Sequence, residues 1–70
     1  MSNEVFAFRL RMLRERRRVS RRVLAELCGV SKSAMARYER GEREPGIGVV
    51  CELADYFGVS ADYLLGREET

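Results

Sequence analysis

The sequence feature that most constrains the fold is a pair of short helical segments joined by a very short turn, in the stretch Ser20–Glu39. Ser20 and Ser31 each precede a helix-forming run, and a serine there can cap a helix by accepting a hydrogen bond from its first turn. Gly29 follows the first run and can take the left-handed conformation that ends a helix. Ala25, one turn earlier, is small, as a close helix crossing requires. We therefore expect this stretch to be the functional segment of the chain.

Helical periodicity predicts further helices around this pair, and no alternating pattern indicates a strand. The predicted helices are residues 1–18, capped by Ser2 or Asn3, then 21–28, 32–40, 47–57 and 61–65. Side chains expected to face inward from the first and fourth helices are Phe6, Leu10, Leu13, Ile47, Val50, Leu53, Ala54 and Phe57. The sequence thus predicts an all-α domain, a compact five-helix bundle over residues 1–66, followed by a frayed C-terminal tail at 67–70.

The outward face of the predicted helix 32–40 is unusually polar and basic. Ser33, Arg37 and Arg40 recur at i, i+4 and i+7, with Lys32 beside them at the start of the helix. Alanine would make a more stable helix than serine at such a position, so this stripe is not explained by helix stability alone. It indicates a function for the exposed face.

Charge is distributed unevenly along the chain. Residues 1–22 carry eight arginines and two glutamates, a net charge of +6, whereas residues 23–70 carry a net charge of −4. Such an asymmetry is compatible with a positive surface that faces a polyanion. It is equally compatible with a solvated, arginine-rich helix face, and composition alone does not separate the two.

Composition also limits the classes of protein to which the chain can belong. Seventy residues make one domain, and Cys28 and Cys51 are too few for a disulfide scaffold. Without histidine we expect no metal site, and there is no long apolar run or signal peptide. Asp55 and Asp62 lie beside helix caps, and no glycine-rich phosphate loop is present. We expect a reduced, cytoplasmic, soluble protein that is not an enzyme and has no cofactor, no membrane partner and no evident small-molecule effector.

The ordered set of motifs resembles the Cro/C1-type helix-turn-helix domain, often called the XRE family, with the helix-turn-helix at about residues 20–40. The resemblance covers most of the chain without gaps. It rests on RLRMLR from Arg9 to Arg14, SRRVLA and GVS between Ser20 and Ser31, YERGEREP from Tyr38 to Pro45, and LADYFGVSADYLLG from Leu53 to Gly66.

This resemblance implies a phage-repressor-like fold and sequence-specific binding of double-stranded DNA, with helix 32–40 in the major groove. Base edges would be read by Lys32, Ser33 and Arg37, and each good pair is worth roughly 1–3 kcal/mol of discrimination. Phosphates would be held by Arg21, Arg40, Arg43, Arg17 and Arg18. The implied function is a transcriptional regulator, with repression as the expected mode, acting as a symmetric homodimer on a palindromic operator.

The resemblance also implies two contacts that do not involve DNA. Arg14 and Glu39 match positions that form a partly buried structural ion pair in some family members. The symmetric dimer of such domains forms through the C-terminal helices, which makes Ala61 and Leu64 the candidate interface residues here. The alternative for Leu64 is a place in the core of the last helix.

Two features depart from the usual pattern of the family. Arg21 stands where glutamine is common, which keeps a phosphate contact and adds charge, so we expect stronger non-specific DNA binding.

The second departure is apolar residues where polar ones are usual, namely Phe8, Met12, Val23 and Leu27. They either pack on each other and enlarge the core, or form an exposed apolar patch for a protein partner. In the second case the chain would be a protein-interaction module of the same fold, such as an antitoxin or anti-regulator. The basic outward face of helix 32–40 favours DNA, because the cores of protein interfaces are depleted in charge.

Overall fold

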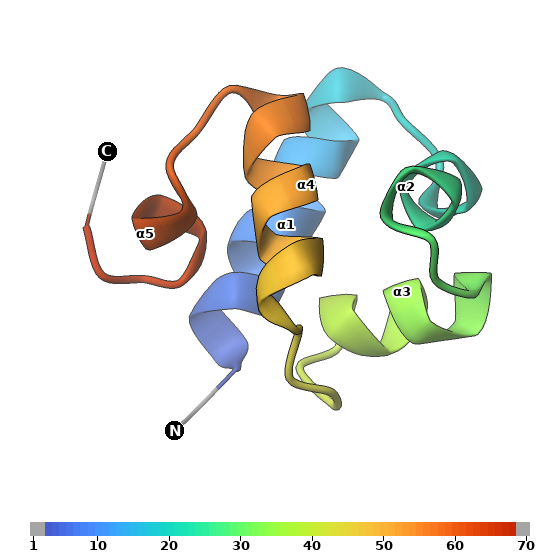
Figure 1. Cartoon of the computed structure of the whole chain (residues 1–70), viewed down its shortest axis with the longest axis horizontal. Coiled ribbons are helices and arrows are strands. Elements are labelled where there is room, and N and C mark those ends of the chain that lie inside the picture. The colour runs from blue at the N-terminus through green and yellow to red at the C-terminus, as the bar shows by residue number, and fades with distance from the viewer. Residues whose placement is uncertain (1–2, 69–70) are drawn as a thin grey trace.

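Five helices make up the structure, a computed structural model that describes residues 3–68 (Figure 1). They are α1 (Glu4–Arg17), α2 (Arg21–Cys28), α3 (Lys32–Glu39), α4 (Ile47–Phe57) and α5 (Ala61–Leu64). Residues 3–68 contain no strand, so the predicted all-α five-helix fold is confirmed. Helix α1 begins at Glu4, three residues later than predicted, and α1, α3 and α5 each end one residue earlier than predicted, as is common at helix ends. None of these helices is long and apolar enough to cross a membrane.

Serine residues form the N-caps of three of the five helices. The hydroxyl oxygens of Ser20, Ser31 and Ser60 each accept a hydrogen bond from the backbone N–H three residues further on, at 2.9–3.1 Å. These bonds satisfy N–H groups that have no partner within the helix. The cap predicted for α1 is wrong at Asn3, whose side chain makes no such bond, and Ser2 lies outside the described residues.

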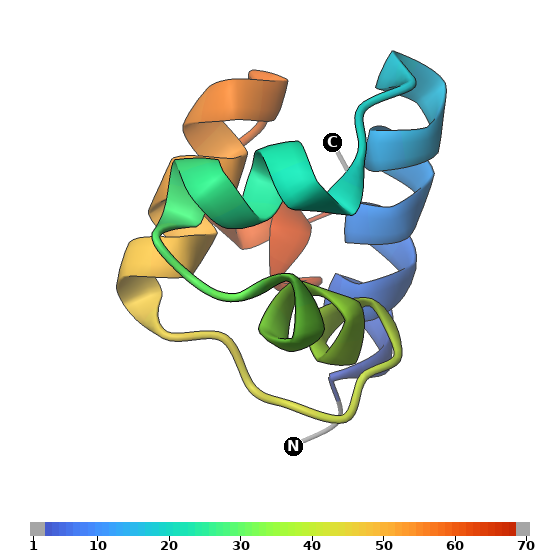
Figure 2. The ribbon, with the colours of Figure 1, turned by 90° about the vertical axis from the view of Figure 1, so that its right-hand side faces the viewer.

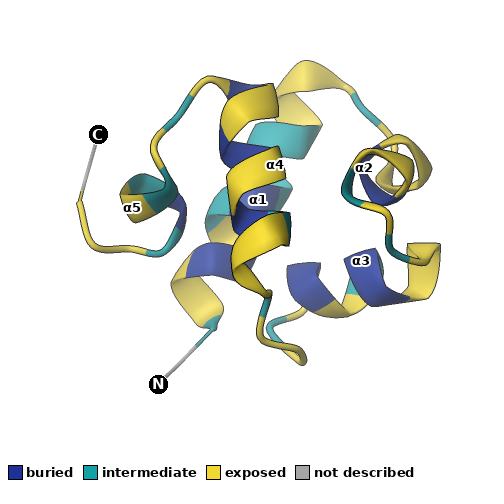
Figure 3. Cartoon of the chain, viewed as in Figure 1, coloured by how far each residue is buried: buried dark blue, intermediate teal, exposed yellow. Residues whose placement is uncertain are grey.

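A single core joins all five helices, and every helix contributes one side chain with no exposed surface. These side chains are Leu10, Leu24, Met35, Leu53 and Leu64. The Phe6 ring packs edge-to-face on Tyr38, with ring centroids 6.4 Å apart, and so joins α1 to α3. Buried residues lie on the helix sides that face the other helices (Figure 3).

The predicted inward face of α4 is confirmed except at its first residue. Val50, Leu53, Ala54 and Phe57 are buried, whereas Ile47 is 73% exposed. The helical period gives Ile47 the same general direction as Val50. However, Ile47 lies in the first turn of α4 and is largely exposed, so the prediction that it is buried is wrong.

Glu39 is the one charged residue buried among residues 3–68, with 2% of its side chain exposed. Its carboxylate accepts hydrogen bonds from Nε and Nη2 of Arg14, at 2.5 and 3.1 Å, and from Nε of Arg21 at 3.0 Å. Arg11 donates to the backbone oxygen of Glu39 at 2.9 Å. The predicted Arg14–Glu39 ion pair is confirmed, and the structure adds Arg21, so that one carboxylate joins α1, α2 and α3.

The segment that follows α5 is bonded to the body of the domain. The backbone N–H of Arg67 donates to the carbonyl of Asp62 at 2.8 Å. The Arg9 guanidinium donates to the carbonyls of Tyr63 and Glu68 and lies 4.2 Å from the centroid of the Tyr63 ring. Residues 67–68 of the predicted tail are thus hydrogen-bonded to the rest of the domain, and residues 69–70 lie outside the described part of the chain.

The two cysteines are free thiols in different environments. Cys28 is half-buried at the end of α2, where burial raises the pKa of its thiol and the negative charge of Glu52 raises it further. Cys51 is exposed on α4.

Replacing Glu39 with alanine should lower the free energy of unfolding by on the order of 3–5 kcal/mol, because it leaves the largely buried Arg14 guanidinium without its carboxylate. Chemical denaturation measures this change. Glu42→Ala is the matched control: it removes a glutamate from an exposed pair with Arg40 and should barely move the midpoint. A Glu39→Ala midpoint equal to that of the wild type would exclude a structural role for the buried pair.

Candidate nucleic-acid interface

The turn between α2 and α3 is fixed by backbone geometry and by one close helix contact. Gly29 has φ of +68°, in the left-handed region that glycine adopts without a Cβ penalty. The N–H of Val30 then donates to the carbonyl of Ala25 at 3.0 Å, and Val30 packs against the core. Ala25 is buried where α2 crosses α3. Figure 2 shows the result, with α3 nearly end-on beneath α2 and its N-terminal turn toward the viewer.

The two faces of α3 differ completely in their surroundings. Its buried residues are Ala34, Met35, Tyr38 and Glu39. The three residues predicted to read bases, Lys32, Ser33 and Arg37, are all exposed. None of their side chains forms a hydrogen bond or ion pair with another residue in the described part of the chain. The structure thus presents two cations and a hydroxyl on the outer face of a helix held rigidly from within.

Two further cations follow α3, and one of them has an acidic partner. Arg40 donates through Nε and Nη2 to the carboxylate of Glu42, at 3.0 and 3.1 Å, in an exposed pair. The hydrogen bond from Arg40 lowers the pKa of the Glu42 carboxyl, and the carboxylate in turn raises the pKa of Arg40. The Arg43 guanidinium lies 5.7 Å from the centroid of the Tyr38 ring. Arg43 is therefore the freer of the two cations.

Arg21 bonds to α3 itself. Its Nε donates to Glu39, yet almost half of the side chain is exposed. Sequence reasoning missed this bond because it considered Arg21 only as a phosphate contact. The bond joins the first residue of α2 to the last residue of α3, so it depends on how the two helices cross.

The two arginines at the end of α1 have separate surroundings. Nη2 of Arg17 donates to the carbonyl of Phe57 at 3.1 Å, and its guanidinium lies 5.8 Å from the centroid of the Phe57 ring. This bond satisfies a carbonyl that has no helical partner at the end of α4. Arg18 ends α1 with φ of +55° and is exposed. Arg17 thus has a structural bond that competes with its predicted phosphate contact, whereas Arg18 has none.

The excess of arginine in residues 1–22 is largely structural. Five of its eight arginines donate hydrogen bonds to the chain itself, namely Arg9, Arg11, Arg14, Arg17 and Arg21. The charge asymmetry therefore does not by itself outline a surface for a polyanion. The exposed cations on α3, Lys32 and Arg37, and those that follow it, Arg40 and Arg43, define a surface for a polyanion better.

The apolar residues that depart from the family pattern are mostly exposed. Phe8 is 56% exposed, Val23 and Leu27 are also exposed, and Met12 is half-buried. The expectation that they enlarge the core is therefore wrong for three of the four. Phe8 contacts Arg11, whose guanidinium lies 5.9 Å from its ring centroid.

The predicted dimer residues do not form a surface together. Leu64 has no exposed area because it belongs to the core of the single chain, so its prediction as an interface residue is wrong. Ala61 is half-buried against the same core. The last helix has only four residues, and its one large apolar side chain points inward.

Comparison with known proteins links this arrangement to a family. A family profile described as "Helix-turn-helix domain" matches residues 5–64. The HTH-type transcriptional regulator AnsR of Bacillus subtilis is 43% identical over 61 residues, which cover 87% of this chain and 53% of AnsR. The chain spans about half the length of this and other curated relatives that it matches.

Solved structures share both the helices and their arrangement. The P22 c2 repressor, in a complex with a synthetic operator, superposes with a TM-score of 0.83 at 30% identity, covering 91% of this chain and 97% of that one. The restriction-modification controller protein C.AhdI of Aeromonas hydrophila gives a TM-score of 0.78 at 31% identity, with 89% and 94% covered.

The two serines at the start of α3 should respond differently to the same substitution. Ser31→Ala removes the hydrogen bond to the N–H of Ala34 and should lower the free energy of unfolding by about 1 kcal/mol. Ser33→Ala removes an exposed hydroxyl within the helix and should not lower stability, because alanine is the better helix former. Thermal or chemical denaturation of both variants measures the contrast, and equal decreases in stability would show that Ser31 is no more a cap than Ser33.

Proposed function

The chain belongs to the helix-turn-helix family, and we propose that it is a transcriptional regulator that binds double-stranded DNA with α3 in the major groove. The observation that carries this proposal is the exposed trio Lys32, Ser33 and Arg37 on a helix whose other face is buried. A protein core gains nothing from these side chains, whereas base edges in a groove about 12 Å wide can accept hydrogen bonds from them.

Each residue of the trio has a role that follows from its chemistry. Arg37 suits the O6 and N7 acceptors of guanine through two parallel hydrogen bonds, and Lys32 can bind the same atoms. Ser33 can donate or accept, so it is less selective. The three side chains make no hydrogen bond or ion pair within the described fold, although the positive charge of Arg37 helps to lower the pKa of the Glu42 carboxyl.

Phosphate contacts would hold the protein in register without reading sequence. We assign them first to Arg43 and Arg18, which are exposed and whose side chains form no hydrogen bond or ion pair within residues 3–68. Arg21 can add a contact through its terminal nitrogens, since its bond to Glu39 uses Nε. Arg40 would have to leave Glu42, or share it, to bind a phosphate.

The mode of action is also part of the proposal. We propose repression in the cytoplasm by a symmetric dimer on a palindromic operator, and the likeness to a repressor in complex with a synthetic operator supports the repressor part of this proposal. Two helices that read the two half-sites of such an operator would lie roughly 34 Å apart, one turn of DNA.

An alternative is kept because Phe8, Val23 and Leu27 are exposed. A protein-interaction module, such as an antitoxin or anti-regulator, would use this apolar surface and Met12 rather than the trio. Titration of the protein with mixed-sequence DNA at low and high salt separates the two functions. Salt-dependent binding supports the DNA regulator, and no binding at low salt supports the alternative.

Base reading and phosphate binding should give different signatures on alanine substitution. Lys32→Ala and Arg37→Ala should each weaken binding to the preferred site by roughly 1–3 kcal/mol and relax the preference at one base pair. Arg43→Ala is the matched control, because it removes the same charge from a proposed phosphate contact.

The control should weaken matched and scrambled DNA alike and reduce the slope of log K against log salt by about 0.9 for each phosphate that the variant no longer neutralises. Fluorescence anisotropy with both DNAs over a range of salt concentrations measures these effects. If Lys32→Ala and Arg37→Ala also weaken both DNAs equally, α3 does not read the bases.

A further inference from the structure

An acidic side chain lies among the cations at the C-terminal end of α3. The carboxylate of Glu42 accepts hydrogen bonds from Nε and Nη2 of Arg40, at 3.0 and 3.1 Å, and both side chains are 55% exposed. The roles proposed above use Lys32, Ser33 and Arg37 to read bases and arginines to hold phosphates. They leave the function of Glu42 open.

The backbone at the end of α3 fixes the position of Glu42. Gly41 has φ of +72°, and its N–H donates to the carbonyl of Tyr38 at 3.2 Å. The N–H of Glu42 then donates to the carbonyl of Arg37 at 2.9 Å. These two bonds form the Schellman motif, which ends many helices on a left-handed residue. The backbone of Glu42 is therefore part of the helix cap rather than of a free loop.

Helix stability does not explain an acid at this position. The C-terminus of a helix carries a partial negative charge, which disfavours a carboxylate beside it. The ion pair with Arg40 offsets little of this, because both partners are exposed and water solvates them well when they are apart. The presence of Glu42 is therefore better explained by its effect on what Arg40 can bind.

Carboxylates and phosphates bind arginine in the same way. Both accept two parallel hydrogen bonds from one edge of the guanidinium. Glu42 occupies the Nε–Nη2 edge of Arg40. The hydrogen bond from Arg40, and to a smaller extent the positive charge of Arg37, lower the pKa of the Glu42 carboxyl, so it is ionised at neutral pH. The pair therefore has the geometry of an arginine–phosphate contact, with a carboxylate in the place of the phosphate.

We propose that Glu42 competes with DNA phosphates for Arg40, and so prevents Arg40 from adding to the affinity for the DNA backbone. The inference rests on the proposed function and deepens it: Arg43 and Arg18 bind phosphates, whereas Arg40 stays on its carboxylate. Because phosphate contacts carry no sequence information, Glu42 lowers the affinity for matched and scrambled DNA alike.

Glu42→Gln tests this competition, because it removes the negative charge and keeps the size of the side chain. Arg40 can then neutralise one more phosphate, so binding to scrambled DNA should strengthen about threefold to fivefold. The slope of log K against log salt should become steeper by about 0.9. Fluorescence anisotropy over a range of salt concentrations measures both effects.

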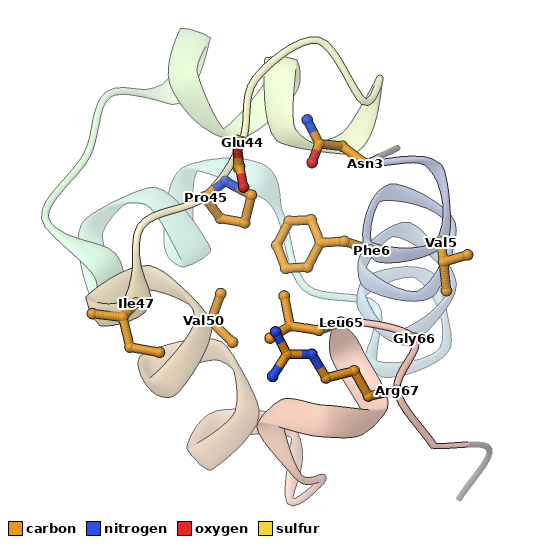
Figure 4. A pocket seen from close by; sticks show the side chains of 10 residues that line it. All are labelled: Asn3, Val5, Phe6, Glu44, Pro45, Ile47, Val50, Leu65, Gly66 and Arg67. Atoms are coloured by element: carbon orange, nitrogen blue, oxygen red, sulfur yellow. The ribbon is translucent and has the colours of Figure 1, made fainter. Parts of the chain in front are cut away.

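Glu44→Gln is the matched control for the loss of a negative charge. Glu44 is exposed in the same loop, and its side chain lines an apolar hollow between the start of α1, the loop before α4 and the segment after α5 (Figure 4). In the part of the chain that the structure describes, it makes no hydrogen bond to Arg40. Glu44→Gln should therefore leave the salt slope at the wild-type value.

A double variant shows whether Arg40 holds a phosphate in the wild-type complex. Arg40→Ala combined with Glu42→Gln removes one charge of each sign, so the net charge stays that of the wild type. If Glu42 keeps Arg40 from the DNA, nothing is lost, and the double variant should bind with the affinity and salt slope of the wild type. A double variant that binds more weakly would show that Arg40 already contacts DNA, and it would overturn the proposal.

Two further results with DNA would also contradict the competition. Equal salt slopes for Glu42→Gln and the wild type would show that the carboxylate does not hold Arg40 back. A changed base preference at one position in Glu42→Gln would instead make Glu42 a base-reading residue, since a glutamate can accept a hydrogen bond from the N4 amino group of cytosine.

Failure of the proposed function is distinguishable from failure of this inference, because the competition can be measured without DNA. A wild type that binds no DNA at low salt would contradict the proposed function. Titration with inorganic phosphate, followed by the NMR signal of the Arg40 Nε–H, tests the competition by itself. The signal should shift more in Glu42→Gln than in the wild type, and equal shifts would overturn the inference.

Discussion

The buried carboxylate of Glu39 is the interaction on which the rest of the structure depends. It is the last residue of α3, and it binds Arg14 from α1 and Arg21 from α2. A lone charge at this depth would be strongly unfavourable, so the three helices must keep their relative positions to satisfy it. The same contact that stabilises the domain therefore sets the angle at which the outer face of α3 is presented.

The arginines of this chain divide between two tasks. Those on α1 mostly donate hydrogen bonds to backbone carbonyls or to Glu39 and hold helix ends and the C-terminal segment in place. The cations on and after α3 are exposed, and of these only Arg40 forms an ion pair within the described structure. The proposed interface is thus defined less by the number of positive charges than by which of them lack a partner within the fold.

Local signals predicted the fold well because they act over a few residues. Serine caps, Gly29 and the helical period gave all five helices within about one turn, and they placed Lys32, Ser33 and Arg37 outward. The predictions of burial and exposure were wrong where a residue's burial depends on whether a segment distant in the sequence covers it. Ile47 has the right period but no neighbour over it, and Leu64 fills a core that other helices complete. Pattern alone also could not show that Arg21 bonds to Glu39, because that pairing depends on the helix crossing.

The most direct test of the central claim, that α3 reads DNA, is selection of binding sites from random double-stranded DNA with the wild-type chain. The account predicts enrichment of a palindrome whose half-sites are centred about one DNA turn apart. It also predicts that Arg37→Ala relaxes the base preference at a single position in each half-site. The absence of any enriched sequence, or an identical enriched sequence after substitution of the whole exposed trio on α3, would contradict it.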